Sequence, residues 1–197
     1  MLAATTNNPV ESGYALFDSA IGRCALVWRG GLVIGAALPE ASDERARASL
    51  ARRFPGVPEA EPPPFAARAI ERVQSLLAGD RSDLGDIAVD LGAGSDFERD
   101  VWEAARRIPC GEVRNYGELA REIGAPQGAQ AVGVALGRNP VPIIVPCHRV
   151  LAADGRSGGF SAPGGVETKF RILEIEGAKR SGQPELFDSL PLKVRPR

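Results

Sequence analysis

The sequence is poor in histidine and cysteine, with one histidine, His148, and three cysteines, Cys24, Cys110 and Cys147, among 197 residues. An odd number of widely spaced cysteines without a CxxC pair excludes a disulfide framework and a zinc knuckle, and favours a reducing cytoplasm. We therefore expect no structural metal. The chain also lacks an apolar run of ~18 residues and a basic, then apolar, amino-terminal stretch, so we expect neither a membrane span nor a secretory signal.

An excess of charge of one sign is also missing, since 24 lysines and arginines face 25 aspartates and glutamates. This balance gives no general attraction to nucleic acid or to membranes, so any nucleic-acid site has to be local. A hydrophobic content of 44% excludes fibrous and fully disordered classes. We predict an α/β domain over residues 1–94, a helical domain over 95–180 and a tail over 181–197.

The first of these domains shows strand and helix patterns in turn. Residues 14–38 gather β-forming side chains around Arg29-Gly-Gly31, which predicts a hairpin. Apolar spacing of three or four residues predicts a helix from Ser42 to Phe54 and a second over residues 65–77. A short apolar run predicts one more strand over residues 87–91.

The second domain begins with helix-capping patterns. Ser95-Asp-Phe-Glu98 is a capping box that starts one helix, and Asn115-Tyr-Gly-Glu118 repeats the pattern. A short helix over residues 118–123 and another over about 128–137, joined by a tight turn, indicate a helix-turn-helix. The helix over 128–137 has almost no charge and several small residues, which suits either close packing on a neighbouring helix or close approach to a nucleic-acid groove.

The segment from Asn139 to Val150 carries the most unusual chemistry. Its prolines forbid a helix, and its apolar side chains require burial, so the backbone is held rigidly inside the protein. The segment presents Cys147 beside His148, and a thiol nucleophile needs a neighbouring base to become a thiolate. A small buried cysteine beside a structural histidine is the alternative. Cys24 and Cys110 lack such surroundings, and we interpret both as structural.

The block from Phe97 to Gly177 resembles the O6-alkylguanine-DNA alkyltransferases. The resemblance rests on Tyr116-Gly-Glu-Leu-Ala120, Ala131-Val-Gly133, Gly159-Phe-Ser161 and above all Asn139-Pro-Val-Pro-Ile-Ile-Val-Pro-Cys-His-Arg-Val150. It implies an RNase H-like α/β first domain and a helical, winged-helix-like second domain that binds DNA. It implies a monomer without a cofactor that repairs O6-alkylguanine and is consumed in one turnover. The sequence leaves open whether O4-alkylthymine is a second substrate.

The same resemblance assigns catalytic roles. Cys147 would accept the alkyl group from O6-alkylguanine and keep it as a thioether. His148 would deprotonate Cys147 through a water, and Glu176 would orient His148. Tyr116 would give a proton to the departing guanine, and Asn139 would order the turn below the cysteine.

Further residues would bind the base and the DNA. Val150 and Ser161 would hold the base through main-chain groups, and Phe160 would help to set the pocket width. The helix with Ala131 and Gly133 would enter the minor groove while the damaged base is flipped out. Gln130 stands where the family usually has an arginine that fills the gap left by the flipped base. Lys169 matches a lysine near the pocket, and the candidates for phosphate contacts are Arg138, Arg149, Arg156 and Lys169.

Other interpretations remain open from the sequence. A non-catalytic damage-recognition protein would lack the cysteine, which this chain keeps, and a cysteine hydrolase would need an oxyanion hole. A helix-turn-helix regulator would need base-reading side chains. In the tail, Gln183-Pro-Glu-Leu-Phe187 resembles short peptides that bind the bacterial sliding clamp, with Leu186 and Phe187 as apolar anchors.

Overall fold

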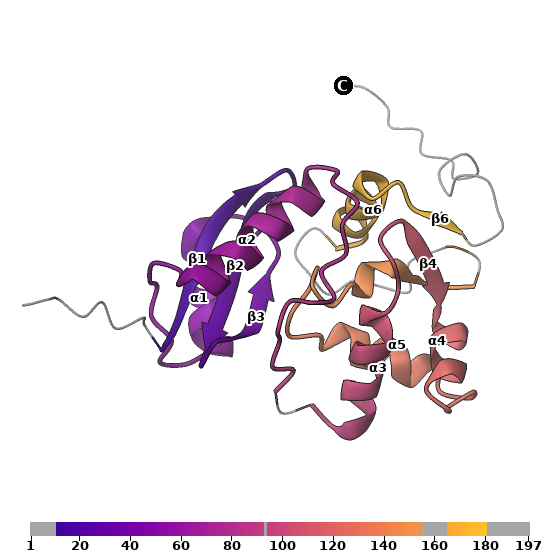
Figure 1. Ribbon diagram of the computed structural model, residues 1–197. Coiled ribbons are helices and arrows are strands. Elements are labelled where there is room, and N and C mark those ends of the chain that lie inside the picture. Colours follow the sequence, from indigo (N-terminus) through magenta and orange to yellow (C-terminus); the bar gives the residue numbers. More distant parts are fainter. Residues whose placement is uncertain (1–10, 93, 154, 156–164, 181–197) are drawn as a thin grey trace, which may run out of the picture.

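The computed structural model describes residues 11–92, 94–153, 155 and 165–180 (Figure 1). Three consecutive strands followed by two helices form its first half, and helices dominate the second. The predicted mixture of α/β and helical structure is therefore confirmed. In the described part of the chain, no helix is both long and apolar enough to cross a membrane.

An antiparallel sheet forms the centre of the first half. Its strands follow the order of the sequence: β1 (Ser12–Ser19), β2 (Gly22–Arg29) and β3 (Leu32–Ala37). The predicted turn at Gly30 and Gly31 joins β2 to β3, and both glycines have positive φ, 56° and 85°. Only glycine adopts such angles without strain, as two-residue hairpin turns require. The sequence predicts one hairpin in this region, and the structure has a second, between β1 and β2.

One helix covers each face of this sheet. Helix α1 (Asp43–Arg53), capped by the Ser42 side chain as predicted, packs Leu50 against the face that carries Ala25 and Val27. Helix α2 (Pro64–Leu77) covers the opposite face, where Leu26 and Trp28 are buried. Side chains alternate between the two faces of β2, which explains why the strand is apolar throughout.

The predicted strand over residues 87–91 is wrong. The structure has a single parallel bridge between Val33 and Val89 in this region, with two hydrogen bonds. The chain turns away after it because the Asp90 side chain accepts the Gly92 N–H at 2.8 Å, and Gly92 has a φ of 64°. One bridge is too short to make a strand, although it does cover part of the β3 edge.

The second half surrounds a small parallel sheet in the order β5-β4-β6. Both predicted capping boxes are present, at Ser95 with Glu98 and at Asn115 with Glu118. The elements are α3 (Asp96–Arg106), β4 (Glu112–Asn115), α4 (Tyr116–Glu122), α5 (Ala129–Gly137), a short 3-10 turn (Cys147–Arg149), β5 (Val150–Leu151), α6 (Gly165–Ile175) and β6 (Lys179–Arg180). Helices α4 and α5 pack together after the tight turn that the sequence predicts.

The two halves share one hydrophobic core. It runs from Trp28 in the sheet to Trp102 on α3 and Leu119 on α4. The Trp102 indole N–H donates to the Ala135 carbonyl at 2.8 Å, which ties α3 to α5 inside the core. The segment that leads to Cys147 contributes Val141, Ile143, Ile144 and Val145 to the same core.

Candidate active site around Cys147

The turn before Cys147 is held by the Asn139 side chain. Its amide nitrogen donates to the Val145 carbonyl at 2.8 Å, and its amide oxygen accepts the Val141 N–H at 2.9 Å. Ile143 has a φ of 76°, an uncommon conformation for a β-branched residue. Such backbone persists only where its surroundings fix it. Asn139 thus supports a strained turn that leads directly to Cys147.

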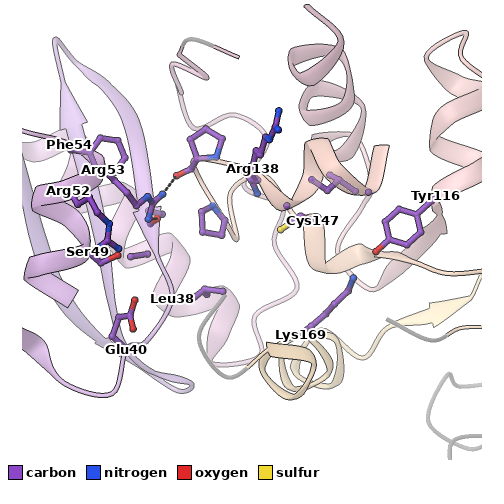
Figure 2. A pocket seen from close by; sticks show the side chains of 18 residues that line it. Leu38, Glu40, Ser49, Arg52, Arg53, Phe54, Tyr116, Arg138, Cys147 and Lys169 are labelled. Atoms are coloured by element: carbon purple, nitrogen blue, oxygen red, sulfur yellow. Dashed lines mark hydrogen bonds between the residues drawn. The ribbon is translucent and has the colours of Figure 1, made fainter. Parts of the chain in front are cut away.

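Cys147 lies in a cavity of about 800 Å³ that both halves of the chain line (Figure 2). Its residue is 7% exposed, and it begins the 3-10 turn, with its N–H bonded to the Val145 carbonyl at 2.8 Å. Burial raises the pKa of the Cys147 thiol, while the Asn139 side chain and the charge of Lys169 act in the opposite direction. The thiol therefore needs help to lose its proton at neutral pH.

His148, which follows Cys147 in the sequence, forms a buried pair with Glu176. His148 Nε2 lies 3.0 Å from Glu176 Oε1. Burial lowers the pKa of His148, against the effect of the carboxylate, so the imidazole is neutral at physiological pH. A neutral ring that donates Nε2–H to Glu176 keeps Nδ1 as its acceptor nitrogen. The pair can therefore accept a proton.

Arg149 completes a buried network with this carboxylate. Its Nε donates to Glu176 Oε2 at 2.9 Å, and one terminal nitrogen donates to Oε1 at 2.8 Å. Burial alone would raise the pKa of Glu176, but the hydrogen bonds of His148 and Arg149 and the Arg149 charge lower it to about 2. The other terminal nitrogen of Arg149 reaches the Ile108 carbonyl at 2.6 Å and Asp83 at 3.3 Å.

Two predicted phosphate contacts are wrong. Arg149 is only 3% exposed, because its guanidinium neutralises the buried Glu176. Lys169 is 1% exposed, and its ammonium donates to the Val150 carbonyl at 2.6 Å and lies 5.9 Å from the centre of the Tyr116 ring. Neither cation reaches the surface. Burial lowers the pKa of Lys169 to about 8, and the ammonium lines the cavity with Cys147.

Helix α5 carries the residues predicted to approach DNA. Gln130 and Ala131 are exposed, while Gly133 is half-buried and faces the Tyr116 ring. Arg138, just after the helix, has a side chain that is 69% exposed and pairs with Glu98 at 2.9 Å. The last predicted residues, Arg156, Phe160, Ser161, Gln183, Leu186 and Phe187, lie outside the described residues.

The first half of the chain also contributes to the site, which the sequence reasoning missed. Arg53, at the end of α1, donates to the carbonyls of Ala36 and Pro140, both at 3.1 Å. The Ala36 N–H donates to the same Pro140 carbonyl at 3.0 Å. In the sequence, Arg53 is one of several basic residues at the end of a helix, so no local pattern distinguishes it.

The fold and the site define a cysteine-dependent protein whose thiol lies beside two short packed helices, and comparisons with known proteins give its family. Residues 96–178 match the family model described as 6-O-methylguanine DNA methyltransferase, DNA binding domain. The methylated-DNA–protein-cysteine methyltransferase of Mycobacterium tuberculosis is 37% identical over 175 residues, which are 89% of this chain and 98% of that relative. Its namesake in Methanosarcina acetivorans is 41% identical over 115 residues, 58% of this chain and 70% of that relative.

Solved structures agree with these sequence relatives. The crystal structure of the M. tuberculosis O6-methylguanine methyltransferase matches with a TM-score of 0.70 at 37% identity, covering 84% of this chain and 92% of that one. The M. tuberculosis OGT in complex with DNA matches with a TM-score of 0.68 at 37% identity, covering 83% and 92%. The chain belongs to the methylated-DNA–protein-cysteine methyltransferase family.

Proposed function

We propose that this protein repairs DNA by taking the alkyl group of O6-alkylguanine onto the sulfur of Cys147, once per molecule. The observation that carries the proposal is the buried Cys147 thiol in a cavity, followed directly in the chain by a histidine bonded to a buried carboxylate. The family's relatives that carry the name methylated-DNA–protein-cysteine methyltransferase support the same reaction.

Each residue around Cys147 has its own role in the proposed transfer. His148 accepts the thiol proton through a water, and Glu176 holds the imidazole in the tautomer that can do so. The Lys169 charge stabilises the Cys147 thiolate. A new S–C bond forms as the O6–C bond breaks, and the guanine that leaves takes a proton from Tyr116. Neutral water does not hydrolyse the C–S bond of an alkyl thioether, so the thiol is not regenerated and the protein acts once.

In the proposed function, helix α5 contacts the DNA. Its small residues let the backbone approach a minor groove, and exposed Gln130 takes the place of the flipped base. The DNA complex of the M. tuberculosis relative supports DNA as the partner. Domains over residues 1–94 and 95–180, with RNase H-like and winged-helix-like folds, belong to this proposal. So does a sliding-clamp contact through Leu186 and Phe187, which a clamp pull-down with both residues changed to alanine tests.

The stoichiometry of repair tests the proposal. With excess duplex that carries O6-methylguanine, we expect one lesion to be repaired per protein molecule and none by a Cys147→Ser variant. Many cycles per molecule would instead indicate a cysteine hydrolase. Tight lesion binding without any repair would indicate a damage-recognition protein, the alternative function.

A further inference from the structure

The cavity continues well beyond the thiol that it contains. Tyr116 and Lys169 line it on the side of α4 and α6, and the opposite wall is formed by Glu40, Ser49 and Arg52 of the first half (Figure 2). Cys147 lies between these two walls. At about 800 Å³, the cavity has the size of a site for a drug-sized ligand, which leaves room beside a flipped guanine for a substituent longer than methyl.

The far wall presents one face of α1. Ser49, Arg52 and Arg53 are spaced three and four residues apart, so they share a side of the helix. Arg53 is occupied by the carbonyls of Ala36 and Pro140. Arg52, in contrast, makes no hydrogen bond or ion pair with the residues that the structure describes, and its positive charge lines the cavity.

The charges around this end of the cavity are predominantly positive. Arg52, Arg53 and Arg138 line it together with a single carboxylate, Glu40. Arg138 is neutralised by its own ion pair outside the cavity, whereas Arg52 stands beside Arg53. Burial and the neighbouring charge of Arg52 lower the pKa of Arg53, although the Glu40 carboxylate acts in the opposite direction, which agrees with two cations and one anion close together. An anionic or hydrogen-bond-accepting group is therefore favoured at this wall.

We propose that Ser49 and Arg52 form a subsite for the far end of long O6 substituents and select chains that end in a carboxylate or another acceptor over chains that end in a cation. This inference rests on the proposed alkyl transfer. In that reaction the carbon next to O6 becomes bonded to Cys147, and the rest of the chain stays attached to it. The cavity must therefore hold the chain before and after the transfer, and α1 decides which chain ends fit.

Single-turnover transfer from three duplexes tests the subsite: one carries O6-methylguanine, one O6-carboxypentylguanine and one O6-aminopentylguanine. We expect the unmodified protein to transfer the carboxypentyl group about fivefold faster than the aminopentyl group, the size of effect that one partly exposed charge supplies. Arg52→Ala should bring the two rates within about twofold, and Arg52→Glu should reverse their order. Transfer from O6-methylguanine should stay unchanged in both variants.

Arg45→Ala is the matched control, because Arg45 lies on the same exposed helix but outside the cavity. It removes the same charge and should keep the preference of the unmodified protein. The subsite is refuted if the unmodified protein shows no preference, or if Arg52→Ala and Arg45→Ala change it equally. Failure of methyl transfer in the unmodified protein would instead refute the proposed function itself, so the two failures are distinguishable.

Discussion

Replacing Glu176 by glutamine should cost much of the protein's stability at neutral pH. The pKa of Glu176 is about 2 in the folded protein against an ordinary value of 4.5, because His148 and Arg149 stabilise its charge despite burial. A difference of about 2.5 pKa units corresponds to roughly 3 kcal/mol of the free energy of unfolding. A lowered carboxyl pKa stabilises the fold above the unfolded value, and this stability disappears as the pH falls through the folded value. A glutamine at this position has no carboxylate and therefore lacks this stabilisation at every pH.

Urea denaturation at two pH values measures this effect. At pH 7, Glu176→Gln should lower the free energy of unfolding by about 3 kcal/mol, and at pH 3.5 the difference should shrink to about 2 kcal/mol as the unfolded carboxyl takes up protons. Glu174→Gln, an exposed change two residues earlier, should cost less than about 0.5 kcal/mol. An equal, small loss in both variants would refute the buried charge network. So would a difference that does not depend on pH.

Three other changes test separate parts of the site. The lowered pKa of Lys169, about 8, means that its burial costs stability at pH 7 and that this cost fades between pH 8 and 10.5. Lys169→Met should therefore raise the free energy of unfolding at pH 7 by about 1 to 3 kcal/mol while slowing transfer to Cys147, and urea denaturation with single-turnover rates checks both. Arg53→Met removes two hydrogen bonds, one to Ala36 and one to Pro140, and should lower the free energy of unfolding by about 1 kcal/mol in the same urea assay; no loss would show that these bonds do not stabilise the fold. Gln130→Arg should speed repair of duplex lesions more than of single-stranded ones, and equal effects on both would contradict a role in base flipping.

Local sequence patterns were sufficient for most elements of the fold. The capping boxes at Ser95 and Asn115 and the glycine turn at Gly30-Gly31 depend on neighbours in the chain, and the structure has all three. The predicted strand over 87–91 failed because its pairing is decided by distant contacts with Val33. Periodicity reports that a segment is apolar, but not whether a partner strand lies alongside it.

The site was predictable only in part, for a similar reason. The rarity of histidine and the prolines around Cys147 indicate the reactive segment. The sequence alone predicts that charged residues such as Arg149 and Lys169 are exposed. Arg149 and Lys169 are buried because Glu176 and the Val150 carbonyl offer them partners that only the folded chain brings near. The contribution of α1 to the cavity likewise arises from packing between the two halves of the chain.

Mapping the alkyl group to one cysteine is the most direct test of transfer to Cys147. The protein is incubated with a duplex that carries O6-methylguanine, digested and analysed by peptide mass spectrometry. Cys24 and Cys110 do not line the cavity that contains Cys147, and burial raises the pKa of both to about 11, so neither thiol should compete. We expect one methyl group per molecule, on Cys147 and on neither of the other cysteines. A methyl group on Cys24 or Cys110, or an unmodified protein with the lesion still in the DNA, would contradict this expectation.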